Sequence, residues 1–360
     1  MLISVVVGTR PEIIKMAPVY FALKKARLGP RLVHSGQHYD SRMSKVFFEG
    51  LGLPEPDSFL GVGSDTPGRQ TGEAIAKFER EFTETCPDCV LVEGDTNTVL
   101  AGALAAVKMR IRVGHVEAGL RSYDLRMPEE LNRRLTDHAS DLLFAPTTDS
   151  VQILRGEKVW GKIFKTGNTV IDATLRYMPM ALKSSSIMDE VPWDDYALAT
   201  LHRAENVDHP ETLRNMVKVL MDSKLPVVLP LHPRTELRLR EQGLASKLAQ
   251  SENVRLVPPV GYFDILVLMK NSKLILTDSG GIQEEATSPV IKKRVLVMRK
   301  TTERPEAVRA GYCKVVGTEP QRILKEIRSF LRTSRIRFKP CPYGRGDSGE
   351  RIASILKREL

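Results

Sequence analysis

Residues 2–15 read LISVVVGTRPEIIK: a continuous apolar run, a glycine turn, and then Pro11, a residue favoured in the first turn of a helix. Uninterrupted apolar runs of this length are typical of parallel strands buried on both faces. The run has no basic lead-in and no small-residue cleavage site, so we predict a first strand over 2–7 and no signal peptide. Pro18 falls inside the helix that follows, and we expect it to kink or restart that helix.

The succession of apolar run, polar turn and helical pattern recurs along the whole chain. Strict alternation of strand and helix predicts a doubly wound parallel sheet with right-handed crossovers. We predict two such Rossmann-like α/β domains that face each other across a central cleft. The predicted strands span 2–7, 31–34, 89–92, 111–116, 142–145 and 163–166 in the first half, and 197–201, 227–231, 254–257, 274–277, 295–298 and 314–316 in the second.

The domain boundaries are predicted from length and from a loss of periodicity. A chain of 360 residues exceeds the usual size of one compact domain. Around residues 176–195 the pattern gives way to Met-Pro-Met, Ser-Ser-Ser and Val-Pro-Trp. We therefore expect a first domain over 1–170, a linker over 171–195, a second domain over 196–340, and a crossing segment with a final helix over 341–360.

Composition excludes several classes of protein. Hydrophobic residues make up 42% and charged residues 27%, which is ordinary for a globular protein. No apolar run is long enough for a membrane span, and four cysteines favour a reducing cytoplasm over a disulfide framework. The net charge of +10 comes mainly from residues 290–345. We find no recognisable nucleic-acid module there, so most of these charges are interpreted as a solvated face.

Polar residues follow the predicted strands, and ligands of open α/β sheets bind beyond the carboxyl ends of their strands. We expect these residues to form one rim on each sheet, and the two rims to meet. The segments are 8–10, 35–38, 93–96 and 117–119 in the first half, and 202–203, 232–234 and 278–281 in the second.

The segment 278–285, DSGGIQEE, follows a strand and opens a helix. Gly280 and Gly281 allow the backbone to approach a ligand, and free N–H groups at the start of the helix attract an anion. Ser279 caps the helix and can contact phosphate, while Glu285 can accept hydrogen bonds from ribose hydroxyls. An ordinary capped helix is the alternative. The pattern favours a phosphate site, with the clamping guanidinium groups supplied by Arg10 and Arg304.

Acid–base groups stand at comparable positions. Asp95 and Glu117 follow strands, Glu130 lies in the first turn of a helix, and His202 follows a strand of the second half. Carboxylates gathered in a partly dry cleft raise one another's pKa, which suits proton transfer near neutral pH. The alternative for each is a helix cap or a salt bridge.

Other motifs do not support a cofactor or a metal. The first strand is not followed by G-x-G-x-x-G, and the chain has no P-loop sequence. His115-Val116-Glu117 matches part of a zinc deaminase pattern but lacks the downstream Pro-Cys-x-x-Cys. Cys86 and Cys89 are interpreted as part of the turn before a strand, with a redox pair or a bridge as the alternative.

Taken together, these motifs resemble the non-hydrolysing UDP-N-acetylglucosamine 2-epimerases over nearly the whole chain. The resemblance implies the two-domain GT-B fold. The matching segments are 8–12, 37–40, 94–96, 115–122, 128–130, 167–168, 202–203, 277–286 and 302–308.

The resemblance implies reversible conversion of UDP-N-acetylglucosamine to UDP-N-acetylmannosamine, by elimination of UDP to 2-acetamidoglucal and re-addition. It implies no cofactor, no metal, a homodimer, and a role in polysaccharide biosynthesis. The catalytic set implied by it is Asp95, Glu117, Glu130 and His202. The UDP contacts are Arg10, Lys15, Ser279, Gly280, Gly281, Glu285 and Arg304.

Some bacterial relatives bind a second UDP-N-acetylglucosamine as an activator, near positions that match Gln37, Gln70 and His232. Many relatives carry arginine where this chain has Ala204. The competing functions are an epimerase of a 2,3-diacetamido uronic acid UDP-sugar, a hydrolysing epimerase, a GT-B glycosyltransferase and a UDP-sugar sensor without activity.

Overall fold

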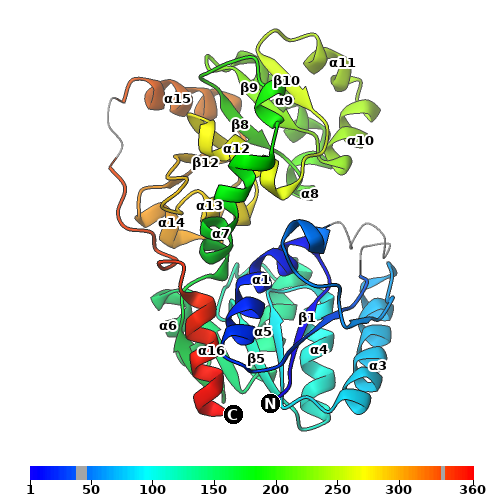
Figure 1. The fold of residues 1–360 in the computed structure, drawn as a ribbon. Coiled ribbons are helices and arrows are strands. Elements are labelled where there is room, and N and C mark those ends of the chain that lie inside the picture. Colours follow the sequence, from blue (N-terminus) through cyan, green and yellow to red (C-terminus); the bar gives the residue numbers. More distant parts are fainter. Residues whose placement is uncertain (38–46, 334–336) are drawn as a thin grey trace. The chain divides into compact units, whose positions relative to one another are not determined.

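The computed structural model of the chain describes residues 1–37, 47–333 and 337–360 (Figure 1). It divides into two compact units. Unit 1 comprises Met1–Ala173 together with Tyr343–Leu360, and unit 2 comprises Thr174–Pro342. In the described part of the chain, no helix has both the length and the apolar character that crossing a membrane requires.

Unit 1 is built on a seven-stranded parallel sheet with the order β3-β2-β1-β4-β5-β6-β7. β1, β4 and β6 are wholly buried, as their continuous apolar runs predict. The strands are β1 (Ile3–Val7), β2 (Pro30–His34), β3 (Ser58–Phe59), β4 (Cys89–Glu93), β5 (Arg112–Val116), β6 (Leu142–Ala145) and β7 (Lys162–Lys165). The helices are α1 (Arg10–Lys25), α3 (Pro67–Thr85), α4 (Asn97–Lys108), α5 (Pro128–Ala139), α6 (Thr148–Gly156) and α16 (Ser348–Glu359).

Unit 2 repeats this plan with a six-stranded parallel sheet of order β10-β9-β8-β11-β12-β13. Its strands are β8 (Ala197–Thr200), β9 (Val227–Pro230), β10 (Val254–Val257), β11 (Leu274–Thr277), β12 (Val295–Val297) and β13 (Cys313–Val315). Its helices are α8 (Ala204–Val207), α9 (Pro210–Asp222), α10 (Pro233–Glu241), α11 (Leu244–Ala249), α12 (Tyr262–Asn271), α13 (Gly280–Glu285), α14 (Pro305–Arg309) and α15 (Pro320–Leu331).

Each sheet has one point at which the strand order reverses. In unit 1 it lies between β1 and β4, and in unit 2 between β8 and β11. Right-handed crossovers on either side of such a point place helices on opposite faces of the sheet, which opens a crevice at the strand ends. The predicted rim residues follow the strands that border each reversal or the strands next to them, β2, β5 and β9.

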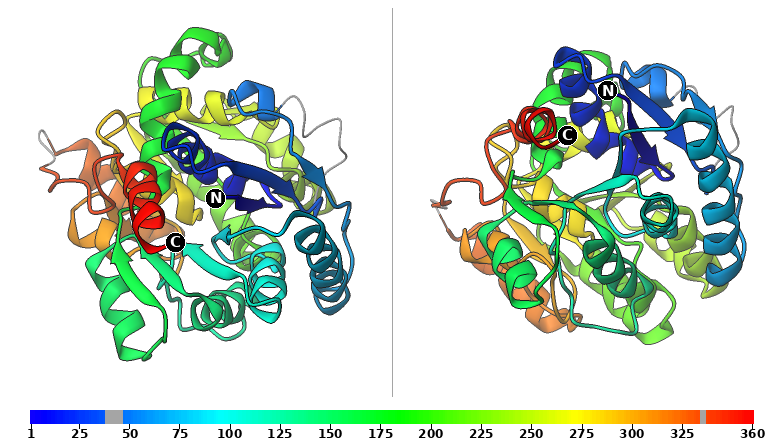
Figure 2. Two further views of the ribbon diagram at one scale, coloured as in Figure 1. Left: turned by 60° about the horizontal axis from the view of Figure 1, so that its bottom comes forward. Right: turned by 90° about the horizontal axis from the view of Figure 1, so that it is seen from below.

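The helix opened by Pro11 runs unbroken from Arg10 to Lys25, so the expected restart at Pro18 is wrong. Packing from outside the helix supports this turn, because α16 lies beside α1 in the views of Figures 1 and 2. A Cβ atom on Gly349 would lie 2.8 Å from the Pro18 carbonyl oxygen, so the start of α16 approaches this turn as closely as glycine permits. The Gly349 N–H also donates to Asp172 at 2.9 Å.

The stretch in which the helical pattern weakens is itself largely helical. α7 (Thr169–Ser184) continues through Pro179, and the short 3₁₀ helix η1 (Ile187–Glu190) precedes β8. The transition between the units falls within α7, after Ala173, and the chain returns to unit 1 at Tyr343. The final helix, α16, is therefore part of unit 1.

Candidate functional site

In unit 1 the candidate residues surround the reversal between β1 and β4. Thr9 is the N-cap of α1, and Arg10 is the first residue of this helix. The Glu12 carboxylate turns back to accept the backbone N–H of Gly8 at 2.6 Å and that of Thr9 at 3.3 Å. This reciprocal capping fixes the loop between β1 and α1, and thereby the position of Arg10.

Asp95 lies in the loop between β4 and α4, and α5 holds this loop in place. Arg133 donates to the Asp95 carboxylate at 2.6 Å, and its other terminal nitrogen lies 3.2 Å from Glu130. Asn132 donates to the Asp95 carbonyl oxygen at 3.0 Å. One turn of α5 therefore connects two of the predicted acids.

Glu130 is completely buried and already engaged by several donors. It accepts the Ser122 N–H at 2.7 Å, the Ser122 hydroxyl at 2.8 Å and the Arg134 guanidinium at 2.9 Å. Burial tends to raise its pKa, but these hydrogen bonds and the charge of Arg133 outweigh that effect and hold the pKa below its usual value. The expectation that the clustered acids raise one another's pKa is therefore wrong for Glu130.

Glu117 follows β5 in the left-handed region of backbone conformation, with φ of 70°. Such a conformation costs on the order of 1–3 kcal/mol for a residue other than glycine, so the surroundings must hold it in place. Its carboxylate is bonded to the Lys15 ammonium and accepts from the Asn168 amide at 3.3 Å. Lys15, expected as a UDP contact, also donates to Glu93 at 2.9 Å. The Lys15 ammonium thus lies between two carboxylates.

A second buried network supports the same loops from behind. His115 Nδ1 lies 2.7 Å from the Asp137 carboxylate, and His115 Nε2 lies 2.9 Å from the Gly94 carbonyl oxygen. Asp137 also accepts the Gly119 N–H at 3.2 Å and pairs with Arg121 at 2.7 Å. The Gly94 turn before Asp95 and the turn after Glu117 are therefore tied to one buried carboxylate.

The proposed activator positions of unit 1 come together at the start of α4. Gln37 accepts from the Thr98 hydroxyl at 2.6 Å, and Gln70 accepts from the Asn97 side chain at 2.9 Å. Both glutamines are buried. His38, Tyr39 and Asp40, which belong to the same sequence motif, lie outside the described residues.

In unit 2 His202 follows β8 and is oriented by Asp278, which follows β11. His202 Nδ1 lies 3.0 Å from the Asp278 carboxylate, which also accepts the N–H groups of His202 and Arg203. Burial of Asp278 works against its ionisation, but His202 and these N–H groups hold its pKa below the usual value. The His232 ring centroid lies 5.7 Å from that of His202. His202 therefore stands at the reversal point of the second sheet, and His232 follows the neighbouring strand β9.

The start of α13 is flanked by two guanidinium groups. Ser279 is the N-cap and accepts the Ile282 N–H at 3.5 Å. A Cβ atom on Gly280 would lie 3.7 Å from Arg304 Nη2 and 4.0 Å from Arg203 Nη2, so both cations lie close to this glycine. Arg304 forms an ion pair with Glu284. This combination of glycine, N-cap and cations is suited to an anion such as diphosphate.

Glu285, expected to contact ribose, is buried at the end of α13 beside Tyr262. Burial raises the pKa of Tyr262 well above its usual value, and the charge of Glu285 raises it further. The phenol is therefore neutral at ordinary pH and can act as a hydrogen-bond donor.

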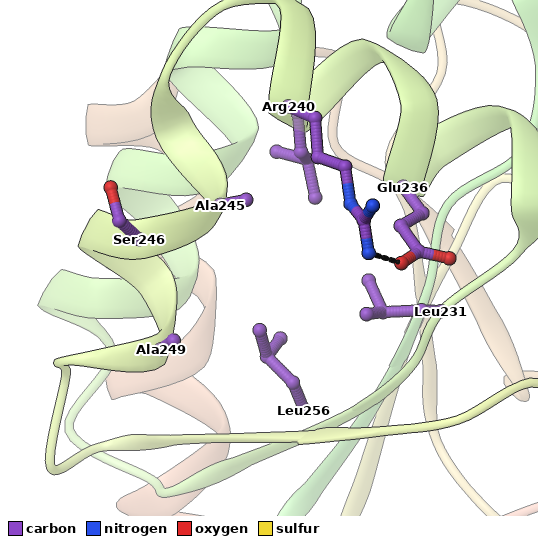
Figure 3. Close-up of a pocket in the computed structure, with 8 residues that line it drawn as sticks. Leu231, Glu236, Arg240, Ala245, Ser246, Ala249 and Leu256 are labelled. Atoms are coloured by element: carbon purple, nitrogen blue, oxygen red, sulfur yellow. Dashed lines mark hydrogen bonds and ion pairs between the residues drawn. The ribbon is translucent and has the colours of Figure 1, made fainter.

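A separate surface pocket of about 290 Å³ lies between α10 and α11 (Figure 3). Leu231 and Leu256 form part of its apolar lining, and Arg240 pairs with Glu236 at 2.5 Å beside them. None of the predicted catalytic or UDP-binding residues lines this pocket.

Several residues around the candidate acids were not singled out from the sequence. Arg133 and Asp137 lie inside α5 with no local motif to distinguish them from a solvated helix face. Glu93 and Arg203 lie next to predicted residues at strand ends. Their position in the rim segments could have identified them as candidates. The four cysteines, Cys86 and Cys89 among them, are free thiols.

Comparison with known proteins finds the chain similar to members of one enzyme family. The family model described as UDP-N-acetylglucosamine 2-epimerase matches residues 22–357. A UDP-N-acetylglucosamine 2-epimerase of Methanocaldococcus jannaschii is 46% identical over 365 residues, with 99% of each chain covered. A UDP-2,3-diacetamido-2,3-dideoxy-D-glucuronate 2-epimerase of Pseudomonas aeruginosa is 40% identical, with 99% of this chain and 100% of the relative covered.

Among solved structures, the M. jannaschii UDP-GlcNAc 2-epimerase in complex with UDP-GlcNAc and UDP has a TM-score of 0.91 at 45% identity, covering 99% of this chain and 100% of that chain. Two doubly wound parallel α/β units with these neighbours place the protein in the GT-B fold class, which confirms the fold expected from the sequence. The chain belongs to the UDP-N-acetylglucosamine 2-epimerase family.

Proposed function

We propose that the protein interconverts UDP-N-acetylglucosamine and UDP-N-acetylmannosamine by inverting C2 of the sugar, without releasing free sugar. The observation that carries this proposal is the pair of acids at the carboxyl ends of the neighbouring strands β4 and β5, in a chain of this family. Asp95 is held by Arg133, and Glu117 is held by Lys15. Both carboxylates follow parallel strands, where α/β sheets present catalytic groups.

The chemical difficulty is that the C2 hydrogen is not adjacent to a carbonyl group and is barely acidic. Loosening of the C1–O bond places positive character on C1, and this makes the C2 hydrogen removable by a carboxylate. The C2–H electron pair then forms the C1=C2 double bond of 2-acetamidoglucal, and the C1–O pair leaves with UDP. Returning a proton to the opposite face of C2, as UDP adds back to C1, completes the inversion.

Unit 2 would hold the leaving group in this scheme. Ser279, Gly280, Gly281 and Arg304 are suited to the diphosphate, and Arg10 of unit 1 is the further cation that we assign to it. Preorganised donors at such a position are worth about 3–4 kcal/mol each in the transition state. Asp95 and Glu117 would serve proton transfer at C2, with Glu130 in a supporting role and His202 completing the catalytic set. In this scheme unit 1 supplies the acids and unit 2 supplies most of the leaving-group contacts.

The roles of the three acids differ in this proposal. Asp95 and Glu117 are the groups that exchange protons with C2. Glu130 is ionised and saturated with hydrogen bonds, so its part is to hold Arg133 against Asp95. Gln37, Gln70 and His232 remain the proposed contacts of a second, activating UDP-N-acetylglucosamine.

Proton NMR in deuterated water tests the proposal directly. Incubation with UDP-N-acetylglucosamine should introduce deuterium at C2 of both UDP-sugars, with no added cofactor and no net free sugar. Free N-acetylmannosamine would instead indicate a hydrolysing epimerase, and exchange that requires an acceptor sugar would indicate a glycosyltransferase. Binding of UDP-sugar without exchange would indicate a sensor.

The P. aeruginosa relative makes the sugar specificity a separate question. Its name specifies a substrate with a carboxylate on the sugar, and it is 40% identical to this chain. Parallel assays with UDP-N-acetylglucosamine and the diacetamido uronic acid UDP-sugar measure the preference. We expect exchange to be faster with UDP-N-acetylglucosamine, and the reverse order would assign the protein to the uronate.

We also propose a homodimer, supported by an apolar patch around α5. The exposed side chains Leu131 and Leu135 are one helical turn apart, and Tyr123, Leu125 and Trp160 are exposed near this helix. Sedimentation of Leu131→Glu combined with Leu135→Glu should show a monomer. The control Leu237→Glu, at an exposed leucine of α10, should leave the dimer intact.

A further inference from the structure

One cluster in unit 1 contains two carboxyl groups around a single ammonium group. Glu93 is the last residue of β4, Glu117 follows β5, and Lys15 reaches them from α1. The Glu93 and Glu117 side chains are 1% and 4% exposed, and that of Lys15 is 13% exposed. Lys15 donates to Glu93 at 2.9 Å and is also bonded to Glu117. The three groups therefore interact with little screening by water.

The charges of this trio do not balance if both acids ionise. One positive charge would face two negative charges in a buried site, and an uncompensated buried carboxylate is costly. Burial raises the pKa of Glu93 well above its usual value; Lys15 opposes this effect, and the charge of Glu117 adds to it. Both carboxyl groups contact the same Lys15 ammonium, so the two acids lie close to each other. Two neighbouring buried carboxyl groups avoid mutual repulsion when one of them carries a proton, and that proton can be donated to the other.

We propose that Glu93 holds a proton that it shares with Glu117, so that Glu117 transfers protons as one half of a carboxyl pair. This inference rests on the proposed function, in which Glu117 exchanges a proton with C2. Glu93 acts through Glu117 and does not touch the substrate, so it is a positioning residue. The charged groups that act on it are Lys15 from α1 and Glu117 beyond β5.

The pair has a defined consequence for the dependence of activity on pH. A pair that interacts this strongly loses its two protons in two macroscopic steps. Below the first step both groups are protonated, and Glu117 cannot act as a base. Above the second step both are ionised, and repulsion disturbs the position of Glu117. The singly protonated pair is the active form, and Glu93→Gln abolishes the second step while retaining a neutral side chain of the same shape.

The protonation state can be measured without substrate, by infrared spectroscopy of the carboxylic acid carbonyl band at neutral pH. We expect Glu93→Gln to remove the contribution of one protonated carboxyl group. Glu117→Gln should also remove it, because Glu93 then faces only the positive charge of Lys15. The matched control is Glu81→Gln, at a buried glutamate that pairs with Arg31 at 3.0 Å, and it should leave the band unchanged.

The second measurement is the pH profile of deuterium exchange at C2. Glu93→Gln should lose the alkaline limb of the wild-type profile or displace it by more than about one pH unit. A structural ion pair alone would lower the rate at every pH and leave the profile's shape unchanged. An unchanged carboxylic acid band in both Glu93→Gln and Glu117→Gln, or an unchanged profile in Glu93→Gln, would overturn the inference.

The two measurements also separate this inference from the proposed function. If the protein does not exchange C2 at all while the infrared result holds, the shared proton is correct and the proposed function is wrong. If exchange occurs but the infrared band is unaffected in both variants, the proposed function stands and the shared proton is wrong.

Discussion

Arg133 donates to the Asp95 carboxylate at 2.6 Å, and its second terminal nitrogen lies 3.2 Å from Glu130. Asp95 is on the loop after β4, whereas Glu130 is in the first turn of α5. A single planar guanidinium group therefore fixes the position of a loop acid relative to a helix acid.

This relationship predicts the effect of replacing Arg133. Arg133→Lys keeps the positive charge but cannot form both contacts in the same geometry. A shift of Asp95 by about 1 Å should lower the rate of C2 exchange about 100-fold while UDP affinity is unchanged. Exchange by NMR and UDP binding by calorimetry measure the two quantities. Arg134→Lys, at a partly exposed residue that contacts Glu130 and the ring of Tyr123, serves as control and should be much milder. Equal rates for wild type and Arg133→Lys would show that the guanidinium fork is unimportant.

Removing the charge of either proposed acid should separate binding from chemistry. Asp95→Asn and Glu117→Gln preserve the size of the side chains, so we expect UDP to bind with normal affinity. Exchange at C2 should fall at least about 100-fold, because acid–base groups contribute on this scale. The same calorimetric and NMR assays apply. Exchange at the wild-type rate in either variant would remove that residue from the mechanism.

Gly280 offers a test of the anion site that leaves the fold intact. A Cβ atom there would make ordinary contacts, the nearest at 3.7 Å from Arg304, so Gly280→Ala should fold normally. The methyl group would occupy the space in which we propose the diphosphate binds. We expect UDP affinity to fall by about 10-fold to 200-fold. Gly72→Ala, in α3 with open space around its Cβ position, is the matched control. Unchanged affinity in Gly280→Ala would place the diphosphate elsewhere.

The raised pKa of Glu12 should make the stability of the protein depend on pH. Burial raises its pKa from 4.5 to about 7, although hydrogen bonds to the side chain oppose this effect. The folded state therefore binds more protons than the unfolded state between these values, and stability falls as the pH rises through this window. The loss amounts to about 3 kcal/mol at most.

Glu12→Gln can still accept the N–H of Gly8 but does not ionise. The difference in free energy of unfolding, variant minus wild type, should therefore increase steadily from about pH 4.5 to 7. Urea unfolding at a series of pH values measures the difference. Parallel curves for the two proteins would mean that Glu12 ionises normally in the folded state.

Much of the fold was predictable because the apolar runs are short, continuous and bounded by turns. The predicted strand over 142–145 coincides with β6, and the one over 274–277 coincides with β11. β3 was not predicted, since Ser58–Phe59 is too short and too exposed to leave a pattern. The turn of α1 at Pro18 depends on α16, which lies more than 300 residues further along the chain. A contact between residues so far apart in the chain cannot be predicted from a local sequence pattern.

The site was predictable to the level of strand ends but not to the level of partners. Asp95 and Glu117 follow strands, and this position identifies them as candidates. Two contacts could not be predicted from the sequence. Lys15 lies between Glu93 and Glu117, and Arg133 donates to Asp95. Those contacts arise from helices packing on the sheet. Hydrogen bonds and Arg133 hold the pKa of Glu130 below its usual value, whereas burial raises that of Glu93 against the effect of Lys15.

Cleavage of the C1–O bond is the central claim, and positional isotope exchange measures it most directly. UDP-N-acetylglucosamine labelled with oxygen-18 in the bridge between C1 and the β-phosphorus is incubated with the enzyme and followed by phosphorus NMR. If UDP departs and re-adds, its β-phosphate can rotate, and the label should move into non-bridging positions at a rate comparable to epimerisation. Inversion of C2 with the label still in the bridge would contradict the account.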